Sequence, residues 1–262
     1  MIDDLLLELS RLDNVDAICL GGSRANNVYD TKSDYDIYVY INSDIDDDIR
    51  ANILSKYCSY QEIGNHYWEL EDNAILNEDI PIDIIYRKIS DFDLTLDHVV
   101  NRHNSYNGFT TCMWHNLISS MIIYDPYGKI RQLKDKYDIE YSDELKNNII
   151  ERNYHLLTGK LPSYDVQISK AISRNDRVNL ISRCNAFMES YFDIIFAMNK
   201  IKHPGEKRLV EFALNNCLKL PDDFKKNIDK LYDDLLTNTV DVNKDVEVII
   251  NNLSKCLNIS KD

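Results

Sequence analysis

The sequence predicts a mixed α/β (α+β) domain followed by an all-helical bundle domain. Up to about residue 130, short apolar runs of strand length alternate with segments whose apolar residues recur at helical spacing. From residue 142 onward the segments are longer, and all of them have helical periodicity. With 44% apolar residues in 262, the chain can fill two cores. We therefore predict domains at residues 1–130 and 131–262.

In the first domain we expect a helix at residues 2–12 and strands that form a mixed sheet. The expected strands are "VDAICL", "SDYDIYVYI", "YWEL", "IPIDIIYR" and "MIIYDPYG". The segment "EDNAILNED" is predicted to be a polar turn between two of them. "NSDIDDDIRANILSKY" is expected to begin as a turn and continue as a helix, because carboxylates suit the positive end of the helix dipole. "FTTCMWHNLISS" is also helical in pattern.

The second domain is predicted to consist of helices separated by Pro, Gly or Asn. Five segments have the required periodicity: "DELKNNIIERNYHLL", "RVNLISRCNAFMESYFDIIFAMNK", "EKRLVEFALNN", "PDDFKKNIDKLYDDLL" and "VNKDVEVIINNLSKCL". A repeat of fixed period is not evident.

The charge balance restricts the class of partner. The chain has 44 acidic and 30 basic residues, which gives a formal net charge of -14. Such a charge repels nucleic acid and anionic membranes and favours cationic or neutral small molecules. We therefore do not expect a nucleic acid or a membrane as partner, although a local basic patch would still allow a polymer. The sequence does not indicate the oligomeric state.

The cysteines and the N-terminus predict a cytoplasmic protein. Six cysteines lie far apart and form no CxxC pair, which favours free buried thiols over disulfides or zinc. The first residues, "MIDDLLLELSRL", carry acids where a signal peptide would carry positive charge. The apolar runs are also shorter than the roughly 18 residues of a membrane span.

Three aspartates in predicted strands indicate a metal site. Asp34 and Asp36 are two residues apart, so their side chains lie on one face of a strand, about 7 Å apart along the chain. Asp83 stands inside an apolar strand, where a lone carboxylate requires a partner. Three acids on adjacent strands are the oxygen ligands that magnesium prefers. The alternative is a turn that holds the Asp pair, with Asp83 as a salt-bridge acceptor for Arg87 or Lys88.

A glycine-rich turn just before these aspartates is suited to phosphate. Gly21 and Gly22 permit close approach of the backbone to a ligand, while Ser23 and the following amides can donate to phosphate oxygens at a helix start. Arg24 is a further candidate for a phosphate contact, with an ordinary surface arginine as the alternative. A phosphate cradle beside a two-metal carboxylate site indicates phosphoryl or nucleotidyl transfer.

The ordered set Gly22-Ser23, Asp34, Asp36 and Asp83 resembles the signature of the polymerase-β-like nucleotidyltransferase superfamily. The resemblance implies a nucleotidyltransferase-type mixed sheet flanked by helices, two Mg²⁺ ions, and ATP or another nucleoside triphosphate as co-substrate. Further stretches are similar to a bacterial group whose catalytic domain carries a C-terminal helical domain: "GGSRA", "SDYDIYVY", "PIDIIYR", "MIIYDPYGKI" and "FAMNKIKHPGEKRL". This likeness extends to about residue 218. Aminoglycoside adenylyltransferases share the two-part plan, and the helical domain is then expected to close over substrate and nucleotide.

Two further residues are candidates for the reaction. Glu69, in "YWEL", is a candidate general base on the acceptor hydroxyl, with an exposed strand residue as the alternative. Lys207 is predicted to open a helix, where the dipole disfavours a cation unless a phosphate binds there. It is therefore a candidate contact for the nucleotide, and otherwise a surface lysine.

These residues predict a metal-dependent enzyme that transfers a nucleoside monophosphate, AMP from ATP, to a hydroxyl of a small molecule. An aminoglycoside-like antibiotic is one candidate acceptor, since such molecules are cationic. A first alternative is an antitoxin-type adenylyltransferase that modifies a partner protein. A second is a nucleotide-binding module without catalysis, against which the retention of three costly like charges argues.

Overall fold

The computed structural model describes residues 2–25 and 33–259 of the chain. The chain forms two compact units, each described here by itself: Met1–Asp97 with Met113–Ile139, and His98–Cys112 with Glu140–Asp262. The first unit thus continues beyond residue 130, and a short segment of the second unit interrupts it. The division into functional domains at residue 130 stays a prediction.

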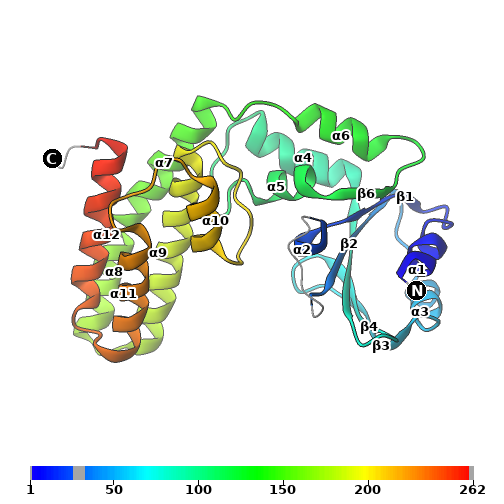
Figure 1. Ribbon diagram of the computed structural model, residues 1–262, viewed down its shortest axis with the longest axis horizontal. Helices are drawn as coiled ribbons and strands as arrows, with labels where there is room; N and C mark the ends of the chain where they lie inside the picture. The colour runs from blue at the N-terminus through cyan, green and yellow to red at the C-terminus, as the bar shows by residue number, and fades with distance from the viewer. Residues whose placement is uncertain (1, 26–32, 260–262) are drawn as a thin grey trace. The chain divides into compact units, whose positions relative to one another are not determined.

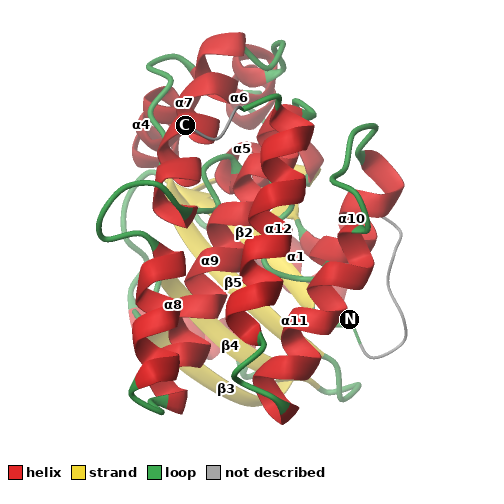
Figure 2. Ribbon diagram, turned by 90° about the vertical axis from the view of Figure 1, so that its left-hand side faces the viewer, coloured by secondary structure: helices red, strands yellow, loops and turns green. Residues whose placement is uncertain are grey.

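The first unit is built on a six-stranded mixed sheet. Its strand order is β3-β4-β5-β2-β1-β6, in which β2 and β5 are parallel and the other neighbours are antiparallel. Figure 2 shows β2, β5, β4 and β3 side by side. The strands are β1 (Val15–Leu20), β2 (Tyr35–Ile41), β3 (Cys58–Asn65), β4 (Leu70–Leu76), β5 (Pro81–Lys88) and β6 (Met121–Tyr124). The predicted fold class, a mixed sheet with flanking helices followed by helices, is confirmed.

Two helices cover one face of this sheet, and they decide which face is left for polar side chains. Helices α1 (Ile2–Leu9) and α3 (Asp47–Leu54) lie together beside the sheet (Figure 1). Their apolar residues pack in one core with alternate residues of the central strands, among them Ile37, Val39 and Ile84. Because side chains alternate along a strand, the residues between these ones point to the opposite face.

The β3–β4 hairpin differs from the prediction. "EDNAILNED" was expected to be a turn and "YWEL" a strand, whereas Leu70–Leu76 forms β4 and residues 67–69 form the bend before it. The reason is that the polar residues of β4 have partners in the tertiary structure. Asp72 is fully buried and binds Arg50 of α3, the Tyr86 hydroxyl (2.9 Å) and the Gly64 amide (2.8 Å). Burial with such partners outweighs the low strand propensity of Asp.

The remaining elements of the first unit follow the predicted pattern in part. The helix expected in "FTTCMWHNLISS" is confirmed as α5 (Cys112–Ser119), and the strand expected in "MIIYDPYG" is confirmed as β6. Helix α6 (Lys129–Tyr137) was not predicted. Helix α4 (Ile89–Val100) follows β5 directly and contains the boundary between the two units. A short helix, α2 (Gly22–Ala25), follows β1.

The second unit is helical, as predicted. Its helices are α7 (Asp143–Leu157), α8 (Tyr164–Ser173), α9 (Arg177–Met198), α10 (Leu209–Asn216), α11 (Phe224–Thr237) and α12 (Val242–Leu257). Each of the five predicted helical segments overlaps one of them, and α8 is an addition. Helix α9 supplies the centre of the core, including Phe187, Tyr191 and Ile195. Across the described part of the chain, we find no helix with the length and apolar character required to cross a membrane.

A buried carboxylate fastens the segment His98–Cys112 to the helices of this unit. Asp193 of α9 accepts hydrogen bonds from the Thr110 amide (3.1 Å), the Thr110 hydroxyl (2.6 Å) and the Asn153 amide group (3.2 Å). Only 1% of Asp193 is exposed. Burial raises the pKa of Asp193 to about 7, although the three donors act in the opposite direction.

The raised pKa of Asp193 makes the stability of the chain depend on pH. The unfolded carboxyl loses its proton near pH 3.8, and the folded one keeps it until about pH 7. We therefore expect the stabilisation by the protonated Asp193 to be fully present below pH 4 and to be lost as the pH rises to 7. The free energy of unfolding should fall over this range by at most on the order of 4 kcal/mol.

Urea denaturation across this pH range tests the prediction. Asp193→Asn is expected to flatten the decline of the unfolding free energy with rising pH. The same change at Asp229, an exposed partner of Lys225, is the control and should leave the slope unaltered. An identical slope for wild type and Asp193→Asn would contradict the prediction.

Candidate active site

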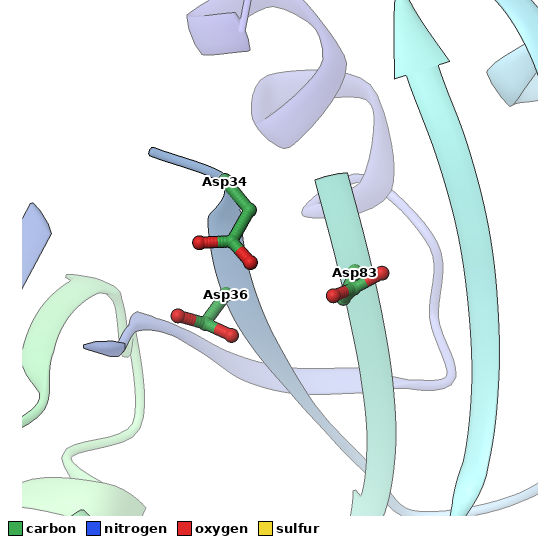
Figure 3. Close-up of side chains that lie close together, drawn as sticks. All are labelled: Asp34, Asp36 and Asp83. Atoms are coloured by element: carbon green, nitrogen blue, oxygen red, sulfur yellow. The ribbon is translucent and has the colours of Figure 1, made fainter. Parts of the chain in front are cut away.

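Three carboxylates of the first unit converge at the start of two neighbouring strands. Asp34 immediately precedes β2, Asp36 is its second residue, and Asp83 is the third residue of β5. Each offers a carboxylate oxygen, and these oxygens all lie within 4.8 Å of one another. Figure 3 shows Asp34 and Asp36 one above the other on one strand and Asp83 on the next. All three side chains are half-buried.

The register of the sheet explains why the carboxylates meet. Strands β2 and β5 run parallel, and Asp36 is the direct partner of Asp83. Ile37 and Ile84, the next residues of each strand, belong to the core under α1 and α3. Since alternate residues face opposite sides, Asp36 and Asp83 must both face away from those helices. Asp34, two residues before Asp36, lies on the same face.

The contacts of Asp83 are not the salt bridge with Arg87 or Lys88 that the sequence left as an alternative. Its carboxylate accepts a hydrogen bond of 2.7 Å from the Asn73 side chain of β4. In the described part of the chain, Arg87 pairs with Glu69, and Lys88 pairs with Asp44. The two cations that could have neutralised Asp83 are thus engaged elsewhere, and Asp83 remains beside two other acids.

The two glycines after β1 are required by close contacts with β2. A Cβ on Gly22 would lie 1.7 Å from Oδ2 of Asp36, and a Cβ on Gly21 would lie 2.2 Å from the Tyr38 ring. Gly22 also has a φ of +60°, which non-glycine residues rarely adopt. The Gly21 amide donates to the Asp36 carbonyl (2.8 Å). The turn therefore packs directly against the strand that carries the carboxylates.

Arg24 lies near the site but binds backbone carbonyls. Its Nε donates to the carbonyl oxygens of Ser33 and Asp34, both at 3.0 Å, and its guanidinium lies 3.8 Å from the centre of the Tyr35 ring. Arg24 thereby holds the backbone at the start of β2, directly at Asp34. Its predicted phosphate contact stays a prediction. The Ser23 side chain, predicted to bind phosphate, lies outside what the structure describes, although its backbone is part of α2.

Glu69, the predicted general base, is held by an arginine. Nε and Nη2 of Arg87 donate to its two carboxylate oxygens at 2.8 and 2.6 Å, and Nη1 donates to Asn116 (2.9 Å). Arg87 is only 7% exposed and also lies over the Tyr38 ring. The catalytic role of Glu69 stays a prediction, but both of its oxygens are used in this ion pair.

Lys207 belongs to the second unit. It lies two residues before α10, which begins at Leu209 with Arg208 as its N-cap. The predicted helix therefore starts slightly later than expected. The contact of Lys207 with a nucleotide stays a prediction.

The donor set of the three aspartates fits a divalent cation. Carboxylate oxygens are the ligands that Mg²⁺ prefers, and three of them in mutual proximity repel one another without a cation between them. Their half-buried position limits the screening of this repulsion by water. A bound cation would convert the repulsion into attraction.

The sequence did not indicate the polar residues that continue from Asp83 along the sheet. Asn73 and Asn65 lie on β4 and β3, and Asn65 donates a hydrogen bond to the Asn73 side-chain oxygen. Glu71 shares their face, and burial, followed by the carboxylate of Asp83, raises its pKa. The alternation in "LEDNAIL" could have indicated the strand β4, but the acidic residues at its start made it resemble a polar turn.

A mixed sheet that holds three carboxylates beside a glycine turn defines the class of nucleotidyltransferases. Comparison with protein families agrees, because residues 2–106 match the nucleotidyltransferase domain family. The match is confined to these residues, and together with the carboxylate cluster it supports a nucleotidyltransferase. Comparison with curated proteins gives no match.

Solved structures align with the chain at low identity. A nucleotidyltransferase-like protein from Exiguobacterium sibiricum is 11% identical, with 98% of this chain and 73% of that chain covered and a TM-score of 0.44. An aminoglycoside 6-adenyltransferase from Bacillus subtilis is 10% identical, with coverages of 99% and 91% and a TM-score of 0.29. A CCA-adding enzyme from Thermotoga maritima, in complex with tRNA, is 11% identical, with coverages of 98% and 83% and a TM-score of 0.29. At these scores the alignments do not establish a common arrangement of the whole chain.

Proposed function

We propose that the protein is a Mg²⁺-dependent adenylyltransferase that transfers AMP from ATP to a hydroxyl of a small cationic acceptor. The observation that carries the proposal is the convergence of Asp34, Asp36 and Asp83, whose oxygens lie within 4.8 Å of one another. Their place in a nucleotidyltransferase domain supports the reaction class. An aminoglycoside-like antibiotic is the acceptor that we favour.

The three aspartates would hold the two metal ions. When bound, Mg²⁺ supplies positive charge that offsets the triphosphate and activates the acceptor hydroxyl. Gly22 leaves room for the Asp36 carboxylate to stand against the turn after β1, and Arg24 fixes the backbone at Asp34. In the reaction, the hydroxyl oxygen bonds to the α-phosphorus and the bond from this phosphorus to the β-phosphate oxygen breaks. Pyrophosphate leaves with that electron pair, and the hydroxyl proton passes to solvent.

The charge of the chain favours a cationic acceptor. The formal net charge is -14, and Glu71 adds a carboxylate to the face that carries Asp83. Burial is the main cause that raises the pKa of Glu71, and the carboxylates of Asp83 and Glu69 raise it further. The contribution of these two carboxylates reflects a negative potential on this face. Such a potential raises the local concentration of cations.

A turnover assay tests the proposed reaction. The protein would be incubated with Mg²⁺ and each α-labelled nucleoside triphosphate, together with a panel of aminoglycosides, neutral sugars and short RNAs. We expect label from ATP on a cationic small molecule and release of pyrophosphate, both lost without Mg²⁺. Transfer to RNA or to neutral sugars in preference to cations would contradict the proposed acceptor. No transfer to any hydroxyl would contradict the proposed reaction.

Binding of nucleotide is predicted to raise the melting temperature. A ligand that binds the folded state alone stabilises it by about 2.7 kcal/mol when its concentration is 100 times the dissociation constant. We expect millimolar Mg²⁺ with ATP to raise Tm by several degrees, and ATP with a chelator to raise it much less. The measurement is a thermal denaturation series, and equal shifts with and without Mg²⁺ would contradict a metal-dependent site.

A further inference from the structure

A chain of side-chain hydrogen bonds crosses three strands and ends on one carboxylate of the site. Asn65 of β3 donates from Nδ2 to Oδ1 of Asn73 on β4, and Asn73 donates from Nδ2 to Oδ1 of Asp83 on β5 (2.7 Å). Asn73 is the direct partner of Asp83 in the antiparallel β4–β5 pair. All three side chains are half-buried, so water competes only in part for these hydrogen bonds.

The neighbours of Asn73 determine which way its amide points. Its NH₂ group donates to the Asp83 carboxylate, which in its ionised form can only accept. Its oxygen lies at the Asn65 NH₂ group, which can only donate. If the amide turned by 180°, its oxygen would face the Asp83 carboxylate and its NH₂ group would face the Asn65 NH₂ group. The observed orientation is therefore favoured at both ends.

We propose that Asn65 and Asn73 act as positioning residues that fix the Asp83 carboxylate for metal and nucleotide binding. Asn73 holds Oδ1 of Asp83, which leaves Oδ2 free to turn toward Asp34 and Asp36. Asn65 acts through Asn73 by keeping its NH₂ group toward Asp83. The inference rests on the proposed function, because the purpose assigned to Asp83 is to bind the metal ion. Removal of a residue that orients a metal ligand typically lowers metal affinity by 10- to 100-fold.

Three single variants test the chain of hydrogen bonds through the binding of Mg²⁺ with a non-hydrolysable ATP analogue, measured by isothermal titration calorimetry. Asn73→Ala removes the donor to Asp83, and we expect the dissociation constant to rise about 10- to 100-fold. Asn65→Asp replaces a donor by an acceptor, which turns the Asn73 amide so that its oxygen faces Asp83. We expect a similar rise, and a smaller one for Asn65→Ala, which removes the donor without reversing it.

The double variant separates positioning from added charge. Asn65→Asp in an Asn73→Ala background introduces the same negative charge where there is no amide to reverse. We expect it to bind the nucleotide analogue as Asn73→Ala does, because residues that act in series are not additive. Asn52→Asp, an exposed position on α3, is a second control for charge and should leave binding unchanged. If Asn65→Asp weakened binding equally in both backgrounds, the proposal would be overturned.

Unfolding experiments without metal or nucleotide keep this inference separate from the proposed function. A double-mutant cycle between Asn65→Asp and Asp83→Asn, followed by urea midpoints, measures whether residues on β3 and β5 are coupled through β4. We expect the two changes to be clearly non-additive, since Asp83→Asn removes the carboxylate that the reversed amide would face. Additive midpoints would overturn the positioning role. The midpoints could instead be coupled while the wild-type protein binds no Mg²⁺-nucleotide. That combination would refute the proposed function alone.

Discussion

Replacement of Asp36 by Asn is expected to lower nucleotide transfer by at least about a thousandfold while the fold remains nearly intact. The two side chains have almost the same size, so the change removes a charge without leaving a cavity. It also removes one of three like charges that lie within 4.8 Å, which relieves repulsion in the absence of metal. Even the loss of one preorganised hydrogen-bond donor costs about a hundred- to a thousandfold in other enzymes.

Transfer kinetics and Tm, measured on the same preparations, check this expectation for Asp36. Tm without ligand should be equal to or above that of wild type, and the rise of Tm with Mg²⁺ and ATP should largely disappear. Asp44→Asn is the matched control, because Asp44 is an exposed aspartate of the same unit whose partner is Lys88. Full activity in the Asp36 variant would refute the assignment of the site.

Replacement of Gly22 by Ala is expected to abolish transfer for a steric reason. The new Cβ would lie 1.7 Å from Oδ2 of Asp36, far inside van der Waals contact, so the carboxylate must leave its position. The left-handed conformation at φ +60° adds strain of roughly 1–2 kcal/mol for a residue with a Cβ. The variant should therefore lose both activity and some stability.

Gly128→Ala separates these two effects. Gly128 has a similar φ of +66°, and the nearest atom to its new Cβ is Nε2 of Gln132 at 3.8 Å. We expect both variants to lose the stability that the left-handed strain costs, and Gly22→Ala to lose more because the Asp36 carboxylate is displaced, while transfer falls only in Gly22→Ala. Equal activity of the two variants would show that the contact of Gly22 with Asp36 has no part in the reaction.

The sequence predicted the centre of the sheet and the place of the carboxylates because these depend on local alternation. In β2 and β5 the aspartates interrupt strongly apolar runs of strand length. This pattern indicates a buried strand that carries a polar residue. The spacing of Asp34 and Asp36 then fixed a common face. That Asp83 lies on the same face as Asp36 followed only from the parallel register, which the structure shows.

Features that depend on partners distant in the sequence could not be predicted. The strand β4 contains Asp72 and Asn73, and its polar residues are explained by Arg50 on one face and Asp83 on the other. Likewise, no residue near Glu69 in the sequence indicates that it pairs with Arg87. A charged residue has the same appearance in a sequence whether it is solvated, paired or catalytic, and only the arrangement of its neighbours distinguishes these cases.

The parallel pairing of β2 with β5 has a consequence for the order in which the chain gains its structure. Between these strands the chain forms α3, β3 and β4, so the ends of a long connection must meet before Asp36 and Asp83 become neighbours. Closing such a connection is entropically costly and slow compared with forming a hairpin. Chains that end before β5 therefore lack Asp83 and cannot bring the three carboxylates together. Under the proposed function, a divalent cation would stabilise only the completed sheet.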